Sequence, residues 1–329
     1  MSVLVTGGAG YIGSFTVEAL RRRGDAVIVF DNLSTGHRRA VAPDVPFHQG
    51  ELTDRELLRR IMREHAVTQV VHFAASISVP ESVQHPEQYI QNNVVGTFSL
   101  LEAMREQGVG QIVFSSTAAV YGEPRQTPIE ESHPTAPTNP YGLTKRFIEQ
   151  MLESYEVAHG LRHVALRYFN ACGGAPGRGE DHHPESHLIP LVLQVALGQR
   201  ETIIIFGDDY PTRDGTCVRD YIHIDDLAQA HLLALDYLKN GQPSRKINLG
   251  NGEGTTVREL IDVARQVTGH PIPARTAPRR AGDPSTLIAS SQLARQVLSW
   301  QPQYPELRTI VDSAWQWHRT HPGGYEEES

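Results

Sequence analysis

Thr117, Tyr141 and Lys145 have the residue types and spacing of a proton-transfer site. Tyr141 and Lys145 are four residues apart, so they share one face if the segment is helical. An ammonium group near a phenol favours the phenolate and lowers its pKa, which would let Tyr141 act as a base near neutral pH. Thr117 could hydrogen-bond the same substrate oxygen. The Tyr-x-x-x-Lys pattern also occurs as a surface pair, so its assignment depends on the other motifs.

A glycine-rich segment at residues 7–13 has the composition of a phosphate-binding turn. Gly7, Gly10 and Gly13 are spaced as GxxGxxG rather than GxGxxG. Between a strand and a helix, such glycines allow a tight turn, let the backbone approach a pyrophosphate, and point a helix N-terminus at negative charge. We therefore expect a dinucleotide cofactor at this turn.

Asp31 ends the second apolar run of the chain and indicates which dinucleotide is bound. A carboxylate at this place accepts hydrogen bonds from the adenosine ribose and repels a 2′-phosphate, which favours NAD over NADP. Arg38 and Arg39 follow closely and keep NADP as an alternative. A purely structural alternative is that Asp31 forms a turn with Asn32.

Short apolar runs alternate with helical patterns through the first 170 residues. Apolar runs without polar alternation are typical of parallel strands that are buried on both faces. The sequence therefore predicts an α/β fold with a doubly wound parallel sheet, whose carboxyl edge carries the ligand site. The expected strands are residues 3–5, 26–30, 69–73, 111–115 and 163–167, and the expected helices are residues 11–23, 54–65, 86–107 and 141–159.

The pattern becomes irregular after residue 170, where Gly and Pro are frequent. We predict a dinucleotide-binding Rossmann domain at residues 1–170 and a second, smaller α/β substrate domain at residues 171–329. Residues 225–249 could return to the first sheet. Further helices are expected at residues 188–198, 225–239, 257–268 and 306–319, and strands at residues 202–206 and 246–249.

Composition excludes several classes of protein. Of the 329 residues, 39% are hydrophobic and 21% charged, which is typical of a soluble globular chain. The net charge of -8 argues against a nucleic-acid partner, so an anionic ligand would need local arginines. The first residues do not resemble a signal peptide, no apolar run suits a bilayer, and Cys172 and Cys217 cannot form a disulfide framework. We expect a cytoplasmic protein without a membrane partner.

Several longer motifs resemble the extended short-chain dehydrogenase/reductase superfamily. These motifs are residues 6–13, 31–32, 114–122, 141–145 and 167–170. Residues 206–223, FGDDYPTRDGTCVRDYIH, resemble the signature of the UDP-glucose 4-epimerase family, and the resemblance extends to about Trp317. It implies bound NAD, a UDP-sugar substrate and a homodimer formed through the helices at residues 86–107 and 141–159.

The resemblance also implies a role for individual residues. Its catalytic residues are Thr117, Tyr141 and Lys145. Its cofactor shell is Gly7, Gly10, Tyr11, Ile12, Gly13, Asp31, Asn32, Glu51, Leu52, Phe73, Ala74, Ala75, Asn93, Tyr141, Lys145 and Tyr168. Its substrate shell is Thr117, Asn170, Leu188, Phe206, Arg219, Tyr221, Arg280, Asp283 and Leu287.

The substrate shell has the chemistry that a nucleotide sugar requires. Arg219 and Arg280 can neutralise a diphosphate through forked donors, although Arg280 could instead be solvated beside Arg279. Phe206 can pack near uracil, and Asp283 can accept hydrogen bonds from ribose hydroxyls. The arginines would supply the local positive charge that the acidic chain as a whole lacks.

The reaction implied by the resemblance is an epimerisation without net redox change. Tyr141 would take the proton of the sugar 4-hydroxyl while C4 gives hydride to NAD⁺; the 4-keto sugar turns, and hydride returns to its opposite face. A related dehydratase would carry acidic residues after Thr117, where Ala118 and Ala119 stand. A reductase and a non-catalytic nucleotide-sugar sensor are further alternatives, and the three retained catalytic residues argue against the sensor.

Four positions depart from the family pattern or leave it ambiguous. Ile77 stands where a Lys is common, Glu51 where an Asp is common, and His187 where an Asn is common. Leu287 stands at the position that limits the sugar pocket, where a large aromatic accompanies plain hexoses and Ser or Cys admits N-acetyl sugars. We expect UDP-glucose and UDP-galactose as the main pair, with UDP-GlcNAc and UDP-GalNAc as the alternative.

One loop gathers metal-ligating residue types, but no metal is expected there. His182, His183 and His187 stand among Glu180, Asp181 and Glu185. Adjacent histidines in a loop that contains proline are not spaced to chelate from one face.

Overall fold

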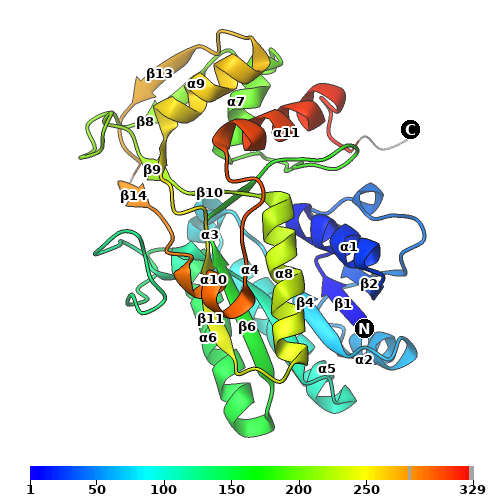
Figure 1. Ribbon diagram of the computed structural model, residues 1–329. Coiled ribbons are helices and arrows are strands. Elements are labelled where there is room, and N and C mark those ends of the chain that lie inside the picture. Colours follow the sequence, from blue (N-terminus) through cyan, green and yellow to red (C-terminus); the bar gives the residue numbers. More distant parts are fainter. Residues whose placement is uncertain (281–282, 326–329) are drawn as a thin grey trace.

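The protein is described by a computed structural model over residues 1–280 and 283–325. A seven-stranded sheet lies at its centre, and all neighbouring strands are parallel (Figure 1). Apolar runs buried on both faces explain this arrangement, since Val3, Leu4 and Val5 are fully buried. The predicted doubly wound α/β fold is confirmed. In spatial order the strands are β11 (Arg245–Leu249), β6 (Arg162–Tyr168), β5 (Gln111–Thr117), β4 (Gln69–His72), β1 (Ser2–Thr6), β2 (Ala26–Asp31) and β3 (Phe47–Gln49).

Helices cover both faces of this sheet. On one face, α1 (Tyr11–Arg23), α8 (Ile224–Lys239) and α10 (Gln292–Leu298) share an apolar core with the strands. On the other face, α2 (Arg55–Glu64), α5 (Gly96–Gln107) and α6 (Pro140–His159) enclose a second core. The result is a three-layer unit with helices outside and the sheet inside.

The strand order reverses beside β1, which lies between β2 and β4. Consecutive strands run to one side as far as β3, and then the chain crosses to β4 on the other side. The loops after β1 and β4 therefore diverge and leave a crevice at the carboxyl edge, where ligands of such sheets bind. The glycine turn follows β1, and Thr117 ends β5 at the same edge.

A second layer of structure lies above this edge and occupies the upper part of Figure 1. Its core is formed by apolar side chains of three helices, α7 (Leu188–Ala196), α9 (Val257–Thr268) and α11 (Leu307–Thr320). Short strands complete it and pair with one another: β7 (Asn170–Cys172) with β10 (Tyr221–His223), β8 (Ile203–Phe206) with β13 (Ala274–Ala277), and β9 (Val218–Arg219) with both β12 (Thr255–Thr256) and β14 (Thr286–Leu287).

Part of the second half of the chain returns to the large sheet. Helix α8 packs on α1, and β11 pairs with β6 along five residues of parallel register. Residues 224–249 therefore belong in space with the first half of the chain. The division into two domains at residue 170 stays a prediction.

The helix expected at residues 86–107 is not regular. It consists of α4 (Pro86–Tyr89), a π-helical segment η2 (Ile90–Val95) and α5. Thr97 binds the carbonyl of Asn93 within this segment, and its hydroxyl also contacts His72 Nε2 at 2.8 Å. Elements too short to show a period were not predicted, including β3, α3 (Val79–Gln84), η1 (Arg38–Ala40), η3 (Ala118–Val120) and most strands of the upper layer.

No helix among the described residues has the length and apolar character needed to cross a bilayer.

Candidate active site

The N-terminus of α6 positions Tyr141 and Lys145 at the carboxyl edge of the sheet. Asn139 caps the helix, because its side chain accepts a hydrogen bond from Gly142 N at 2.8 Å, and Pro140 is the first helical residue. Lys145 lies one turn after Tyr141 and is buried, and its Nζ donates to the carbonyl of Ser115 at 2.9 Å. The structure thus brings the predicted Tyr–Lys pair against the end of β5.

Burial dominates the proton affinity of both side chains. Burial raises the pKa of Tyr141 to about 12, and a hydrogen bond with Thr117 opposes this rise. Burial also lowers the pKa of Lys145 to about 7, and its Nζ lies 6.0 Å from the centre of the Tyr141 ring. The expectation that Lys145 lowers the phenol pKa is wrong for the protein alone, because desolvation of the phenolate outweighs the distant ammonium.

Thr117 lies over a buried charge network that sequence reasoning missed. Beneath it, Ser116 Oγ donates to Glu149 at 2.6 Å, and Arg167 Nε donates to the same carboxylate at 2.8 Å. Arg167 also donates to the Tyr121 hydroxyl at 2.9 Å. Glu149 is four residues after Lys145, so the helical spacing that linked Tyr141 to Lys145 could have found it. The network fixes β5 and β6 against α6 directly below the site.

The glycine turn has the form that a pyrophosphate requires. Gly7 adopts a left-handed φ of +72° with Ala74 against it, and a Cβ at Gly13 would clash with the backbone of Gly7. Helix α1 begins after Gly10 without a side-chain cap, so its first N–H groups and its positive dipole end face the crevice. Tyr11 and Ile12 form its first turn. These residues fit a dinucleotide phosphate.

Asp31 is buried at the carboxyl end of β2. Its carboxylate accepts hydrogen bonds from Ala9 N at 2.9 Å and Leu33 N at 2.8 Å, so it closes a turn as well as facing the edge. Burial raises its pKa, and these two hydrogen bonds oppose the rise. Asn32 does not pair with Asp31, because its amide donates to Glu51 at 3.1 Å. Each carboxylate oxygen of Asp31 retains capacity for a further donor.

Some of the remaining cofactor candidates lie at the carboxyl edge of the sheet, and others hold the loops of that edge in position. Phe73, Ala74 and Ala75 follow β4 directly. Asn93 is fully buried, and its side-chain amide binds both backbone groups of Ser76 at 2.8 and 3.0 Å, so it positions that loop. Tyr168 contacts the Ser115 hydroxyl, while Glu51 and Leu52 line a surface pocket of about 660 Å³.

Four of the substrate candidates lie together above the sheet. Asp283 lies 2.8 Å from Arg280 Nε and 3.8 Å from Arg219 Nη2. The Arg280 guanidinium lies over the Phe206 ring, 4.9 Å from its centre. Two guanidinium groups and one carboxylate leave a net positive charge beside an aromatic ring, which suits a nucleoside diphosphate.

The other substrate candidates lie on the strands and helix around this group. Asn170 and Tyr221 are paired across β7 and β10, and Leu287 is paired with Arg219 across β14 and β9. Leu188 is the first residue of α7. The amide of Asn170 donates to the carbonyl of Asp220 at 2.9 Å, so this side chain also holds backbone in place.

Asp220 is a second residue that sequence reasoning did not single out. Its buried carboxylate accepts hydrogen bonds from the backbone N–H groups of Asn251, Gly252 and Ala289 at 2.8, 3.1 and 3.0 Å. Burial raises its pKa to about 6. Asp220 thereby holds the loop after β11 and the segment after β14 beside Arg219. In the sequence, Asp220 could have been found only from its position between Arg219 and Tyr221 in the motif.

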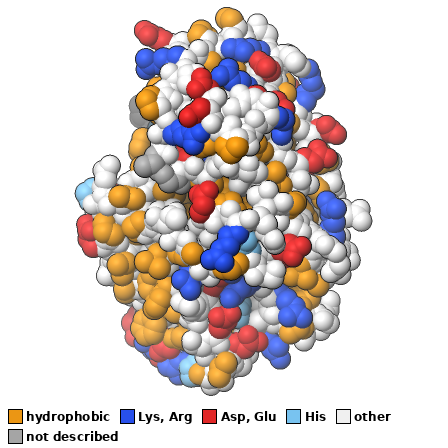
Figure 2. Space-filling view, turned by 90° about the vertical axis from the view of Figure 1, so that its left-hand side faces the viewer, with side chains coloured by type: hydrophobic (Ala, Val, Ile, Leu, Met, Phe, Trp, Pro, Cys, Tyr) orange, Lys and Arg blue, Asp and Glu red, His pale blue; other side chains and the backbone are white. Residues whose placement is uncertain are grey.

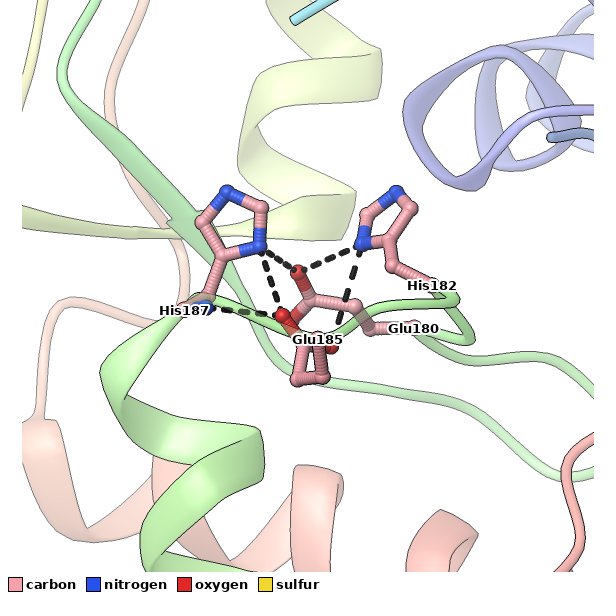
Figure 3. Close-up of side chains that lie close together, drawn as sticks. All are labelled: Glu180, His182, Glu185 and His187. Carbon is pink, nitrogen blue, oxygen red and sulfur yellow. Dashed lines mark hydrogen bonds and ion pairs between the residues drawn. The ribbon is translucent and has the colours of Figure 1, made fainter. Parts of the chain in front are cut away.

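Four side chains of the histidine-rich loop lie close together, which the spacing of the histidines in the sequence did not predict. Glu180, His182, Glu185 and His187 offer ligand atoms that all lie within 4.8 Å of one another (Figure 3). The argument from spacing on one helical face is wrong here, because the loop folds back on itself before α7. His183 points away and pairs with Asp181.

Comparison with known proteins shows to which family this chain belongs. The chain matches the sequence model of the NAD dependent epimerase/dehydratase family over residues 3–250. It belongs to that family. Among curated proteins, it is similar to a UDP-glucose 4-epimerase of Halalkalibacterium halodurans, at 59% identity over 100% of this chain and 99% of that protein.

Solved structures of the family agree with this result. A crystal structure of a UDP-glucose 4-epimerase superposes with a TM-score of 0.97, at 52% identity, covering 99% of this chain and 100% of the other. A UDP-glucose 4-epimerase from Brucella ovis in complex with NAD has a TM-score of 0.93 at 47% identity, covering 96% and 97%. The predicted resemblance to the UDP-glucose 4-epimerases is confirmed over the whole chain.

Proposed function

We propose that this chain is an isomerase that interconverts UDP-glucose and UDP-galactose with bound NAD. The observation that carries this proposal is the position of Thr117, Tyr141 and Lys145, which meet at the carboxyl edge of the sheet beside the glycine turn. The full-length similarity to UDP-glucose 4-epimerases supports the same reaction.

The residues at the glycine turn fit NAD. Gly7 and Gly13 allow a tight turn, because a Cβ would strike Ala74 at the first and Gly7 at the second, and the turn presents the start of α1 to a pyrophosphate. Asp31, at the end of β2, would accept hydrogen bonds from the ribose. When bound, NAD⁺ supplies reversible hydride acceptance at C4 of the hexose.

The chain supplies proton transfer and positioning. Tyr141 exchanges a proton with the sugar 4-hydroxyl, and Thr117, which hydrogen-bonds Tyr141, holds the same oxygen. Lys145 holds the end of β5 beside Tyr141, because its Nζ donates to the carbonyl of Ser115. Arg219 and Arg280 would hold the diphosphate in place and leave the hexose free to turn about it.

Conversion of UDP-galactose to UDP-glucose without added cofactor tests this proposal. We expect the purified chain to form UDP-glucose, because the cofactor is regenerated in each cycle and stays bound. Denaturation should release one equivalent of nicotinamide dinucleotide per chain. Absence of both conversion and released dinucleotide would refute the proposal in favour of a nucleotide-sugar sensor.

Two neighbouring arginines offer a matched test of the diphosphate site. Arg280 contacts Phe206 and Asp283, whereas Arg279 pairs with Asp209 at 2.6 Å. Arg280→Met should raise KM for UDP-glucose by about 10- to 100-fold, because charge-assisted hydrogen bonds to the diphosphate are lost. Arg279→Met should change KM by less than about twofold. Steady-state kinetics check both values, and equal effects of the two substitutions would remove Arg280 from the substrate site.

Leu287 is the residue that we expect to favour UDP-glucose over the larger UDP-GlcNAc. It packs in part against a small apolar cluster that contains Val120 and Tyr121, beside Arg219 on the neighbouring strand. Leu287→Ser should raise kcat/KM for UDP-GlcNAc about 10-fold relative to UDP-glucose, since it opens space for an acetamido group. Competition assays measure this ratio. Faster turnover of UDP-GlcNAc than of UDP-glucose by the unmodified chain would favour the N-acetyl pair as the main substrates.

We propose that the chain acts as a cytoplasmic homodimer. Large apolar side chains are exposed on neighbouring helices, including Ile90 and Phe98 along η2 and α5, and Leu143 and Phe147 on α6. Figure 2 shows apolar side chains gathered on the lower part of one face. Burying such a surface favours association. Sedimentation at micromolar concentration should give a dimer, and a clean monomer would contradict this proposal.

A further inference from the structure

The loop between β7 and α7 gathers two imidazoles and two carboxylates, none of them among the catalytic, cofactor or substrate candidates. Glu180 and Glu185 are nearly fully buried, with 4% and 6% of their side chains exposed. His182 and His187 approach the Glu180 carboxylate from opposite sides, and Glu185 closes the group from below (Figure 3). Both imidazoles point toward the Glu180 carboxylate, and the Glu185 carboxylate lies beside it.

The ligand atoms of these four residues lie within 4.8 Å of one another, close enough to share one metal ion. The Nδ1 of His187 lies 2.8 Å from Glu180 Oε1 and 3.0 Å from Glu185 Oε1. The Nδ1 of His182 lies 3.3 Å from Glu180 Oε1 and 3.8 Å from Glu185 Oε2. Ligands at about 2.0–2.1 Å from a tetrahedral Zn²⁺ are separated by about 3.3 Å. The observed separations lie on both sides of that value, so small side-chain rotations would suffice to admit the ion.

Hydrogen bonding and charge also point to a cation. The Nδ1 of His182 is shielded from solvent and has no hydrogen-bond partner, although it faces both carboxylates. Two carboxylates with so little solvent exposure need a positive charge nearby, and His187 Nδ1 lies within 3.0 Å of both. A divalent ion would neutralise both carboxylates and give the His182 nitrogen a partner.

We propose that Glu180, His182, Glu185 and His187 bind one Zn²⁺ ion. Two imidazole nitrogens and two carboxylate oxygens match the ligands that zinc takes in proteins, whereas Ca²⁺ and Mg²⁺ prefer oxygen alone. The inference goes beyond the proposed reaction, in which the ion takes no part.

A bound ion would connect the loop both to the start of α7 and to the region of the glycine turn. His187 directly precedes α7, where the substrate candidate Leu188 lies. The ring of His182 lies 6.3 Å from that of Tyr11, whose hydroxyl donates to the carbonyl of Gly173 at 2.7 Å. A bound ion would therefore hold the start of α7 in register with the glycine turn.

Metal binding to the untagged, chelator-treated protein tests the proposal. Isothermal titration with Zn²⁺ at pH 7.5 should show one site per chain with a Kd below about 1 µM, and zinc at about 100-fold excess over Kd should raise Tm by about 5 °C. Co²⁺ should bind at the same stoichiometry with the intense visible absorption of tetrahedral coordination. Failure of the protein to bind Zn²⁺ stoichiometrically would overturn the proposal and leave an ion-pair cluster.

Neighbouring histidines of the same loop separate the site from adventitious binding. His182→Ala and His187→Ala should each weaken Zn²⁺ binding by at least about 100-fold and abolish the cobalt spectrum. His183→Ala is the matched control, because its side chain is 77% exposed and pairs with Asp181 outside the group. It should bind zinc as the parent does. Equal loss in all three variants, or retention in His182→Ala and His187→Ala with normal circular dichroism, would contradict the proposed ligands.

Discussion

Replacing Tyr141 by Phe should lower kcat for UDP-galactose by about 10²- to 10⁴-fold while changing KM by less than about threefold. The substitution removes only the hydroxyl that exchanges the proton with the sugar. The ring remains to fill its place in the first turn of α6, and Lys145 keeps its hydrogen bond to Ser115. Coupled-assay kinetics measure the two constants separately.

Tyr155 provides the matched control for this prediction. It lies on the same helix, but its hydroxyl donates to Glu102 at 2.9 Å, away from the carboxyl edge of the sheet. Tyr155→Phe should keep kcat within about twofold. If Tyr141→Phe keeps a comparable kcat, Tyr141 is not the base.

Arg167→Met should lower the free energy of unfolding by about 3–5 kcal/mol. Arg167 and Glu149 are each only 2% exposed and lie 2.5 Å apart, so the substitution leaves a buried carboxylate whose nearest remaining cation is the half-buried Lys246 at 3.9 Å. Urea denaturation at one fixed NAD concentration c measures the change, after the stabilisation RT ln(1 + c/Kd) has been subtracted for each protein with its own separately measured Kd.

Two further variants separate burial of the charge from loss of packing. Arg162→Met is the surface control on the same strand, because Arg162 is 47% exposed and lies 3.7 Å from Glu156, and it should cost less than about 1 kcal/mol. Arg167→Met combined with Glu149→Leu should recover much of the lost stability, since no charge then remains unpaired. If Arg167→Met lowers the free energy of unfolding no more than Arg162→Met does, then the Glu149 carboxylate does not depend on Arg167 for its charge compensation.

The fold could be predicted from sequence because its long elements carry strong periodic patterns. The predicted helix at residues 11–23 coincides with α1, and the predicted strands fall within or beside the observed ones. Strands of two or three residues, such as β9 and β14, contain no period and are formed by contacts with distant segments. The π-helical turn near Asn93 packs against α6, and no local pattern encodes such a contact with a distant helix.

Parts of the candidate site could be predicted from sequence where the residue types and their spacing alone indicate the chemistry. Tyr141 and Lys145 are separated by one helical turn, and the glycines need only their own backbone freedom. The direction of the Tyr141 pKa was mispredicted because burial is a tertiary property that spacing does not report. Glu149 and Asp220 were missed because each acts on partners far away in the sequence.

The return of β11 to the sheet has a consequence for how the chain is made. Until Arg245–Leu249 has left the ribosome, β6 has no partner on one side and exposes a row of backbone donors and acceptors. The upper layer between β7 and β10 is therefore synthesised before the large sheet can close. A fragment ending near residue 170 would keep that open edge permanently, so we expect it to self-associate rather than to bind cofactor as an independent unit.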